Sequence, residues 1–195
     1  MLTDFPTIGT PRLLLRKITE LDAQRLYEIH GNPAVMRWFG SEPLGSLDAA
    51  HSLVKAFATW QTLVNPGTRW GIQRQGDPTL LGSVGLFSWN RQWRKCSVGY
   101  ELAPEAQHQG LMREALNRVL PWGFEHMTLH RIEALIHPDN AASIRLVRGL
   151  GFVEEGRLRE VGRWGGQQHD MLMFSLLRQD WSATADEATA PAAPA

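Results

Sequence analysis

One stretch of this 195-residue chain constrains its fold more than any other. Residues 98–102, Val-Gly-Tyr-Glu-Leu, are followed by residues 107–115, Gln-His-Gln-Gly-Leu-Met-Arg-Glu-Ala. The pattern predicts a β-strand, a tight turn centred on Gly110, and the first turn of a helix. Such a turn directs several unpaired backbone N–H groups at one point, where the helix dipole adds partial positive charge. The segment can therefore bind a pyrophosphate without a lysine.

The loop differs from two common phosphate-binding motifs. Gln107-x-x-Gly110-x-Met112 lacks the Gly-Lys-Ser/Thr of the Walker motif and the three spaced glycines of the dinucleotide fingerprint. The same pattern also fits a plain strand-to-helix turn in which glycine only supplies a permissive backbone. The loop resembles the Gln/Arg-x-x-Gly-x-Gly/Ala loop with which acetyltransferases of the GNAT superfamily bind coenzyme A.

A second segment, residues 132–152, supports this resemblance. An apolar strand precedes Asp139 and Asn140, either of which can cap a following helix, and Gly151 marks the start of a new strand. The segment is most similar to the branch of ribosomal-protein N-terminal alanine and serine acetyltransferases. In that branch Asn-x-x-Ser, here Asn140 and Ser143, is followed by a helix and Leu-Gly-Phe, and forms the second cofactor segment.

The resemblance covers roughly residues 8–181. Residues 10–16 resemble the opening strand of that branch, and residues 155–181 resemble its closing hairpin. We expect a single domain over residues 1–181. Residues 182–195 are rich in Ala, Thr, Asp, Glu and Pro, lack hydrophobic periodicity, and are predicted to form a disordered tail.

The resemblance implies the GNAT fold. This is an α/β (α+β) fold with a mixed, mostly antiparallel central sheet that is splayed at the cofactor site and flanked by helices. Hydrophobic periodicity and turn signals predict helices near residues 20–30, 47–64, 112–127 and 141–149. They predict strands near residues 12–16, 69–74, 80–89, 96–102 and 131–137, and a final pair around the turn Gly165-Gly166.

Composition excludes several classes of protein. No apolar run reaches the length of a membrane span and the N-terminus lacks a signal peptide, so we expect a cytoplasmic protein without a membrane partner. Cys96 is the single cysteine, so an internal disulfide or a cysteine-based zinc site is impossible, and no metal is expected. The 20 basic and 20 acidic residues cancel, which argues against a nucleic-acid partner.

The resemblance implies acetyl-CoA as co-substrate. The predicted cofactor contacts are Tyr100, Leu102, Gln107, His108, Gln109, Gly110, Leu111, Met112, Arg113, Asn140 and Ser143. We expect Asn140 to shape its turn and to contact the pantetheine arm. In this family the amine attacks the thioester directly, without an acyl-enzyme, so Cys96 is expected to be a buried strand residue rather than a nucleophile.

Ser143 is the predicted catalytic acid. Amine acetylation needs a group that takes the amine proton, a donor for the developing oxyanion, and a proton for the departing thiolate. Members of the resembled branch carry a serine here that reaches the coenzyme A sulfur. The tyrosine that many other GNAT enzymes use would fall at Val147, which cannot donate. A role for Ser143 in binding only backbone or cofactor stays open.

Glu101 is the predicted general base, acting directly or through a water, with a pKa raised by partial burial. A salt-bridged or solvent-facing carboxylate is the alternative. His137 and His108 compete for the role, although His108 suits an anion contact and His137 a hydrogen-bonded structural position. The fold alone assigns the oxyanion donor to a backbone N–H near Leu102.

The acceptor site is expected between the N-terminal helices and the final hairpin, in segments rich in aromatic residues. These residues are Trp38, Phe39, Trp60, Trp89, Trp93 and Trp164. Three acceptors stay open: the N-terminal amine of a protein, a small amine or amino acid, and an aminoglycoside-like compound. A module that binds acyl-CoA without turnover is the alternative from another class, and a homodimer is a further possibility.

Overall fold

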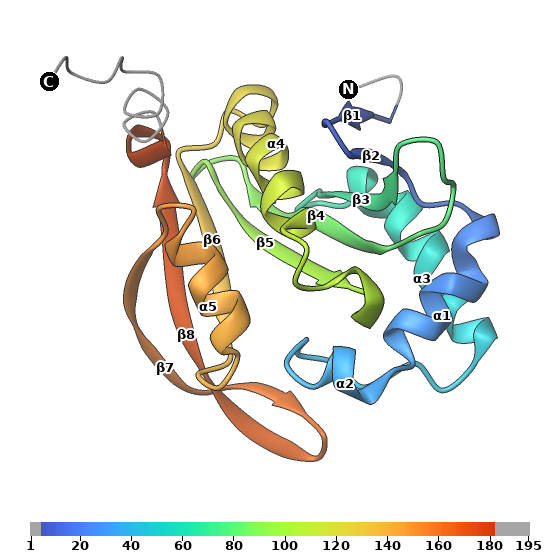
Figure 1. Ribbon diagram of the computed structural model, residues 1–195. Helices are drawn as coiled ribbons and strands as arrows, with labels where there is room; N and C mark the ends of the chain where they lie inside the picture. The colour runs from blue at the N-terminus through green and yellow to red at the C-terminus, as the bar shows by residue number, and fades with distance from the viewer. Residues whose placement is uncertain (1–4, 182–195) are drawn as a thin grey trace, which may run out of the picture.

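The computed structural model describes residues 5–181, and the predicted tail lies outside the described residues (Figure 1). The strands form one sheet in the order β1-β2-β3-β4-β5-β6-β8-β7. Neighbouring strands are antiparallel except β5 and β6, which are parallel, so the predicted mixed, mostly antiparallel sheet is confirmed. The strands are β1 (Ile8–Gly9), β2 (Leu13–Lys17), β3 (Thr68–Arg74), β4 (Gly82–Asn90), β5 (Lys95–Leu102), β6 (Arg131–Ile136), β7 (Val153–Trp164) and β8 (Gln167–Leu177).

The helices pack on the sheet in two groups. The α-helices are α1 (Ala23–His30), α2 (Pro33–Met36), α3 (Leu47–Thr59), α4 (Leu111–His126) and α5 (Ala141–Arg148). Short 3₁₀ turns are η1 (Glu20–Asp22), η2 (Trp60–Thr62) and η3 (Pro104–Ala106). In Figure 1, α4 and α5 lie across the front of the sheet, whereas α1, α2 and α3 gather near its N-terminal strands.

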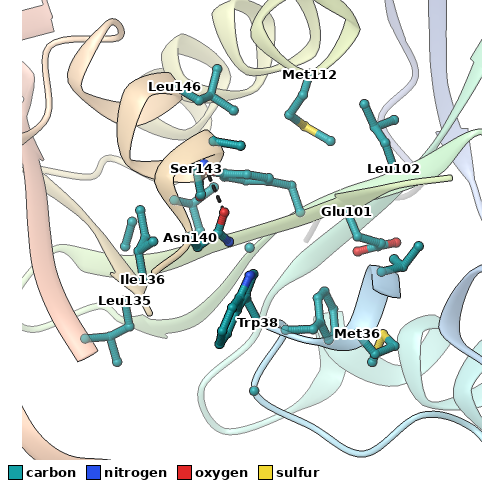
Figure 2. A pocket seen from close by; sticks show the side chains of 18 of the residues that line it. Met36, Trp38, Glu101, Leu102, Met112, Leu135, Ile136, Asn140, Ser143 and Leu146 are labelled. Carbon is teal, nitrogen blue, oxygen red and sulfur yellow. Dashed lines mark hydrogen bonds between the residues drawn. The ribbon is translucent and has the colours of Figure 1, made fainter. Parts of the chain in front are cut away.

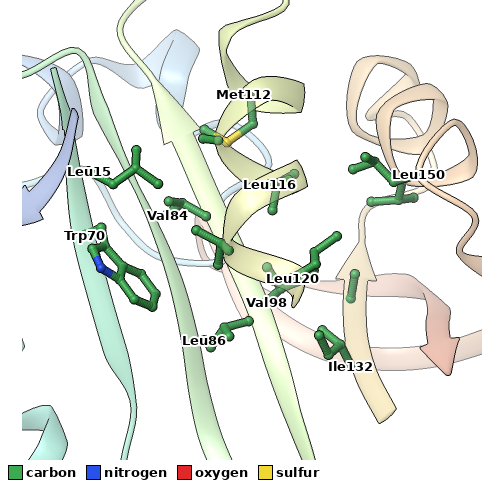
Figure 3. Packing of buried hydrophobic residues seen from close by; sticks show 14 of the residues in the cluster. Leu15, Trp70, Val84, Leu86, Val98, Met112, Leu116, Leu120, Ile132 and Leu150 are labelled. Atoms are coloured by element: carbon green, nitrogen blue, oxygen red, sulfur yellow. The ribbon is translucent and has the colours of Figure 1, made fainter. Parts of the chain in front are cut away.

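Two apolar clusters hold these groups in place. The larger one packs α4, α5 and the turn that follows α5 against the sheet, with Leu116 and Leu120 of α4 facing Val84 and Val98 (Figure 3). The smaller one joins α1 and α3 around the fully buried Leu26. Burial of a leucine side chain contributes about 1.5–3 kcal/mol, so the two clusters fix the positions of the helices on the sheet.

Polar caps and breakers set the ends of the helices. The predicted limits of the first helical region are confirmed, since Thr19 caps η1 and Gly31 ends α1. The helix predicted to reach residue 64 ends earlier, at Thr59, and continues only as the 3₁₀ turn η2.

The sheet opens between β5 and β6. These strands pair only at Lys95–Ser97 of β5 with Arg131–Glu133 of β6. Beyond this seam β5 continues along β4 to Leu102, while β6 continues along β8 to Ile136. The two strands therefore diverge, as the predicted splay requires, and the gap leaves room for a ligand between them.

Candidate active site

A large cleft of about 1310 Å³ lies where β5 and β6 diverge. Pockets for small ligands commonly measure about 300–1,000 Å³, so this cleft can hold a large ligand or two ligands side by side. Figure 2 shows Asn140 and Ser143 of α5 on one side of the cleft and Glu101 of β5 on the other. The part formed by the loop before α4 and by α5 is called here the cofactor half. The part formed by α1, α2, the end of α3 and the sheet is called the acceptor half.

The loop between η3 and α4 presents free backbone N–H groups to the cofactor half. His108 and Gly110 have left-handed backbones, with φ of 59° and 75°, and Gly110 is the N-cap of α4. In the described part of the chain, no backbone carbonyl outside the helix accepts from the N–H groups of residues 108–113. Alternating left- and right-handed residues form a concave anion-binding nest, and the N-terminus of α4 adds its dipole. The loop can therefore bind an anion.

Two glutamine side chains brace this loop from behind. Gln107 donates to the Leu102 carbonyl at 3.0 Å, and Gln109 donates to the Glu105 carbonyl at 2.6 Å. Arg74 donates to the side-chain oxygen of Gln109 at 2.5 Å. Gln109 is the one predicted cofactor residue that does not line the cleft, whereas the other ten predicted contacts do.

Ser143 lies in the first turn of α5, where two polar neighbours hold it. Its backbone N–H donates to the side chain of Asn140, the N-cap of α5, at 3.1 Å. Its hydroxyl lies 2.6 Å from the hydroxyl of Tyr100, which comes from β5. Burial raises the pKa of Tyr100 to about 12, although the hydrogen bond with Ser143 acts in the opposite direction. Val147 is fully buried in the core, so Tyr100 supplies the phenol nearest to Ser143.

Glu101 is held by a buried ionic network. Its carboxylate accepts hydrogen bonds from Arg69 and Ser83, and it lies 3.1 Å from Nε2 of His30. Both charged side chains of the Arg69–Glu101 pair are only 3% exposed. Burial alone would raise the pKa of Glu101, but the Arg69 charge and the hydrogen bonds from His30 and Ser83 lower it to about 2. The expected raised pKa is therefore wrong, and Glu101 is a weak base.

Two glycines make room for this network. Gly85 of β4 lies opposite Gly99 of β5, and a side chain on Gly85 would come within 3.1–3.2 Å of the Arg69 stem. The Arg69 guanidinium lies over three aromatic rings, at 5.0 Å from Phe57, 5.7 Å from Phe39 and 5.9 Å from Trp60. These contacts, together with its bond to Ser83, stabilise a cation deep in the acceptor half.

Comparison with known proteins decides the family. Residues 12–153 match the acetyltransferase (GNAT) domain model, which is more than half of the chain. An uncharacterized N-acetyltransferase of Bacillus subtilis, YoaA, is 34% identical over 174 residues, which cover 89% of this chain and 98% of YoaA. The chain belongs to the GNAT acetyltransferases.

Solved structures agree with this assignment. A putative ribosomal-protein-serine acetyltransferase from Vibrio cholerae has a TM-score of 0.76 at 26% identity, covering 91% of this chain and 99% of the other. A spermidine N-acetyltransferase from Vibrio cholerae, solved with CoA and spermine, also has a TM-score of 0.76 at 26% identity, covering 87% and 98%. The chain is an N-acetyltransferase with the GNAT fold, and its structural neighbours bind CoA at their own sites.

The two competing histidines of this acetyltransferase have other contacts. His137 stacks on Trp38 at a ring distance of 4.1 Å and accepts the backbone N–H of Asp139 on Nδ1 at 3.1 Å. Burial lowers the pKa of His137, as do His169 and Arg37, against the opposing charge of Asp139. Because Nδ1 of His137 already accepts this hydrogen bond, it is poorly placed to take a proton from an amine. His108 is exposed on the loop between η3 and α4.

The aromatic side chains divide into two sets. Trp38, Phe39, Trp60 and Trp164 line the cleft of the acetyltransferase, as expected. Trp89 packs against the main core and Trp93 is 67% exposed, so neither lines it. The final hairpin closes one side of the cleft, because Trp164 donates to the Arg37 carbonyl at 3.2 Å. The backbone N–H of the next residue, Gly165, donates to Glu42 at 2.5 Å.

Two residues of the site, His30 and Arg69, were not predicted from the sequence. A weak signal for Arg69 existed, since it stands beside the apolar residues Trp70 and Ile72 near the start of a strand, and a buried charge requires a partner. His30 carried no comparable signal as the last residue of a helix. Cys96 is buried as expected, and burial raises the pKa of its thiol.

The described residues of the acetyltransferase include neither a membrane-spanning helix nor a metal-binding cluster. Within residues 5–181, no helix has the length and hydropathy that a membrane span requires. In the same range, no three or more His, Cys, Asp or Glu side chains are grouped so that they could hold a metal ion.

Proposed function

We propose that this acetyltransferase moves the acetyl group of acetyl-CoA to the N-terminal amine of a protein. The observation that carries the proposal is the charge of the acceptor half. Glu101, deep in this half, is neutralised by Arg69, and the walls around the pair are aromatic. Such a site suits an acceptor with one amine on an apolar or small residue better than a polycation, which needs several free carboxylates.

The cofactor half supports the use of acetyl-CoA. The free N–H groups of residues 108–113 suit the pyrophosphate, and the diverging ends of β5 and β6 offer unpaired backbone for the pantetheine arm. Leu111 and Met112 give the arm an apolar floor. We assign the remaining predicted contacts, including Asn140, to the same ligand.

The proposed chemistry is direct transfer. The amine nitrogen forms a bond to the thioester carbon, the carbon–sulfur bond breaks, and the sulfur keeps the electron pair and takes a proton. Ser143 is the proposed proton donor, and its bond to Tyr100 supports this role. In the proposed arrangement the Tyr100 phenol donates to Ser143, which leaves the Ser143 hydrogen free for the sulfur. Glu101 stays in the proposed catalytic set, but as a carboxylate of low basicity.

A polyamine is the second candidate acceptor. Glu42 and Asp139 are exposed carboxylates on the lining of the cleft, and they would attract a cation. A spermidine acetyltransferase of Vibrio cholerae is 26% identical over 170 residues, which cover 87% of this chain. The choice therefore depends on whether the exposed carboxylates or the neutralised interior controls acceptor binding.

A panel of acceptors tests the proposal. Peptides beginning with Ala or Ser, the same peptides with blocked N-termini, spermidine and free amino acids are each incubated with enzyme and acetyl-CoA. Thiol release is followed continuously, and products are weighed for the gain of one acetyl group. Acetylation of the free peptides alone supports the proposal. Faster turnover of spermidine than of any peptide would replace it with the second candidate, and CoA binding without thiol release would favour a non-catalytic module.

Four further expectations stay predictions for this enzyme. They are a cytoplasmic location, the absence of a nucleic-acid partner, a homodimer, and a domain boundary near residue 181.

A further inference from the structure

We infer that His30 takes the proton from the attacking amine and that Glu101 positions the His30 ring. The inference rests on amine acetylation in this cleft, whichever amine is the acceptor. It assigns the base to a residue that no sequence motif indicated, and it gives Glu101 a positioning role instead of a direct catalytic one.

The contact between the two residues fixes the tautomer of His30. The Glu101 carboxylate is ionised because Arg69 and Ser83 donate to it, so it can only accept hydrogen bonds. Nε2 of His30, at 3.1 Å, must therefore carry a hydrogen and donate it to Glu101. The other ring nitrogen, Nδ1, then has its lone pair free. Among the described residues, no hydrogen bond to this nitrogen is formed by any donor.

This arrangement is that of a carboxylate that holds a catalytic histidine. A buried carboxylate on one ring nitrogen sets the tautomer, orients the ring and stabilises the imidazolium that forms when the other nitrogen takes a proton. Glu101 meets these conditions better than it meets those of a base, because its own geometry is set by Arg69 and Ser83. The network thus supplies a fixed anion next to the His30 imidazole.

His30 also lies at the right place. It is the last residue of α1, is 2% exposed, and lines the cleft together with Arg69 and Phe39. The edge of the Phe39 ring contacts His30 at a centroid distance of 5.1 Å, which holds the imidazole from the side of α2. The acceptor half therefore has one wall that combines an aromatic surface with the His30 imidazole.

The proton balance of the step is complete. The amine gives one proton to Nδ1 of His30 while its nitrogen forms the bond to the thioester carbon. The carbon–sulfur bond breaks, the electron pair goes to sulfur, and sulfur takes the Ser143 hydroxyl proton. Ser143 regains a proton from solvent, and His30 releases its proton to solvent, so one amide and one thiol are formed.

Two charged groups lie beside the His30 ring. Glu101 favours the imidazolium, whereas the Arg69 cation, bound to the same carboxylate, opposes it. On its own helix, Arg25 is paired with Glu28 and with Glu105 instead. Replacing Glu101 with an uncharged group removes the partner that favours the imidazolium and leaves the one that opposes it, so the imidazolium should form less readily in the variant.

The test is a pH profile with chemical rescue. His30→Ala should lower kcat/KM by about 10²–10⁴-fold, the usual contribution of a general base, with CoA affinity by calorimetry unchanged within a few-fold. Added imidazole should restore part of the rate in this variant.

Glu101→Gln should move the acid limb of kcat/KM to lower pH. Since an α-amine itself titrates near pH 8, the limb is compared for two acceptors of different basicity. His126→Gln, an exposed histidine at the end of α4, is the matched control and should leave rate and limb unchanged.

Several outcomes would overturn the inference. They are a near-normal rate in His30→Ala, a folded and CoA-binding His30→Ala that imidazole does not rescue, and an unmoved limb in Glu101→Gln. If His30→Ala fails to bind CoA, nuclear magnetic resonance of the ring nitrogens in the wild-type protein decides instead. A hydrogen on Nε2 supports the inference, and one on Nδ1 with a bare Nε2 contradicts it. A wrong acceptor assignment would leave this spectrum unchanged, so the two failures can be told apart.

Discussion

The two halves of the cleft are built in different ways. The cofactor half consists of two continuous segments, and its key groups are backbone N–H groups and a helix cap. The acceptor half depends on side chains from α1, β3, β4 and β5, which meet in a buried network around Glu101. Local chain geometry thus prepares one half, and long-range contacts prepare the other. Substitutions in the cofactor half should therefore affect ligand binding alone. Substitutions in the acceptor half should also lower the stability of the fold.

The largest effect is expected at Gly110, in the cofactor half. Gly110→Asp places a carboxylate where the pyrophosphate would lie, and two like charges about 4 Å apart repel by about 4 kcal/mol near a protein surface. CoA affinity should fall about 10³-fold in calorimetry, with little change in unfolding. Gly110→Asn is the matched control, because it keeps the size and tolerates the left-handed backbone. Undiminished affinity in Gly110→Asp would remove the pyrophosphate assignment.

Arg69, in the acceptor half, should affect the stability of the protein and not its affinity for CoA. Arg69→Met leaves Glu101 buried without its cation, which should cost about 3–5 kcal/mol of unfolding free energy in urea at pH 7. In the wild type, the lowered pKa of Glu101 adds stability above its unfolded value of about 4.5, and this is lost as pH falls towards 2. In the variant the carboxyl can protonate, so the difference between the two proteins should shrink on acidification.

A second variant sharpens the Arg69 prediction. Arg69→Met combined with Glu101→Leu removes both charges and should recover most of the lost stability. If the double variant is as unstable as Arg69→Met alone, the damage comes from packing and not from the uncompensated carboxylate.

Ser143 should affect turnover without affecting binding. Ser143→Ala should lower kcat about 10²-fold and leave the Kd of acetyl-CoA within a few-fold, because the variant removes a positioned proton donor. Steady-state thiol release and calorimetry measure the two effects. Equal losses in binding and in kcat/KM, with kcat unchanged, would make Ser143 a cofactor anchor.

Tyr100 should have a smaller effect that depends on Ser143. Tyr100→Phe removes one neutral hydrogen bond, worth about 1 kcal/mol, so kcat should fall about 5-fold. In the Ser143→Ala background the same change should have no further effect. Tyr27→Phe removes the other tyrosine hydroxyl, outside the cleft lining, as a control. Additive losses in the double variant would show that Tyr100 acts independently of Ser143.

The smallest effect is expected at Gln109, which braces the loop between η3 and α4 but does not line the cleft. Gln109→Ala should change CoA affinity by only a few-fold, because the loop N–H groups bind through the backbone. Calorimetry checks this against Gly110→Asp. A loss as large as that of Gly110→Asp would mean that side chains, not backbone, carry cofactor binding.

The sequence predicts the cofactor half well for a physical reason. A strand, a glycine turn and a helix start lie next to one another in the chain, so their order alone determines where the N–H groups point. The same holds for Asn140 as a cap. The order of most helices and strands follows from periodicity in the same way.

The acceptor half could not be predicted to this extent. Whether a carboxylate has a raised or a lowered pKa depends on its neighbours, and those of Glu101 come from positions 30, 69 and 83. Periodicity shows that Glu101 is on a strand but does not identify the cation beside it. For the same reason, periodicity does not distinguish Trp60, which lines the cleft, from Trp93, which faces solvent.

The short seam between β5 and β6 has a mechanical consequence. The sheet consists of one plate, β1 to β5, and a second plate, β6 to β8, and their strands pair at only three positions, Lys95–Ser97 with Arg131–Glu133. Lys95 also binds Glu133 at 3.0 Å, directly on that seam. Beyond this closed end the two plates are joined through the shared apolar core under α4 and no longer through strand pairing. Because the strands diverge from the seam, the pairing at Lys95–Ser97 sets how wide the gap becomes at the far ends of β5 and β6.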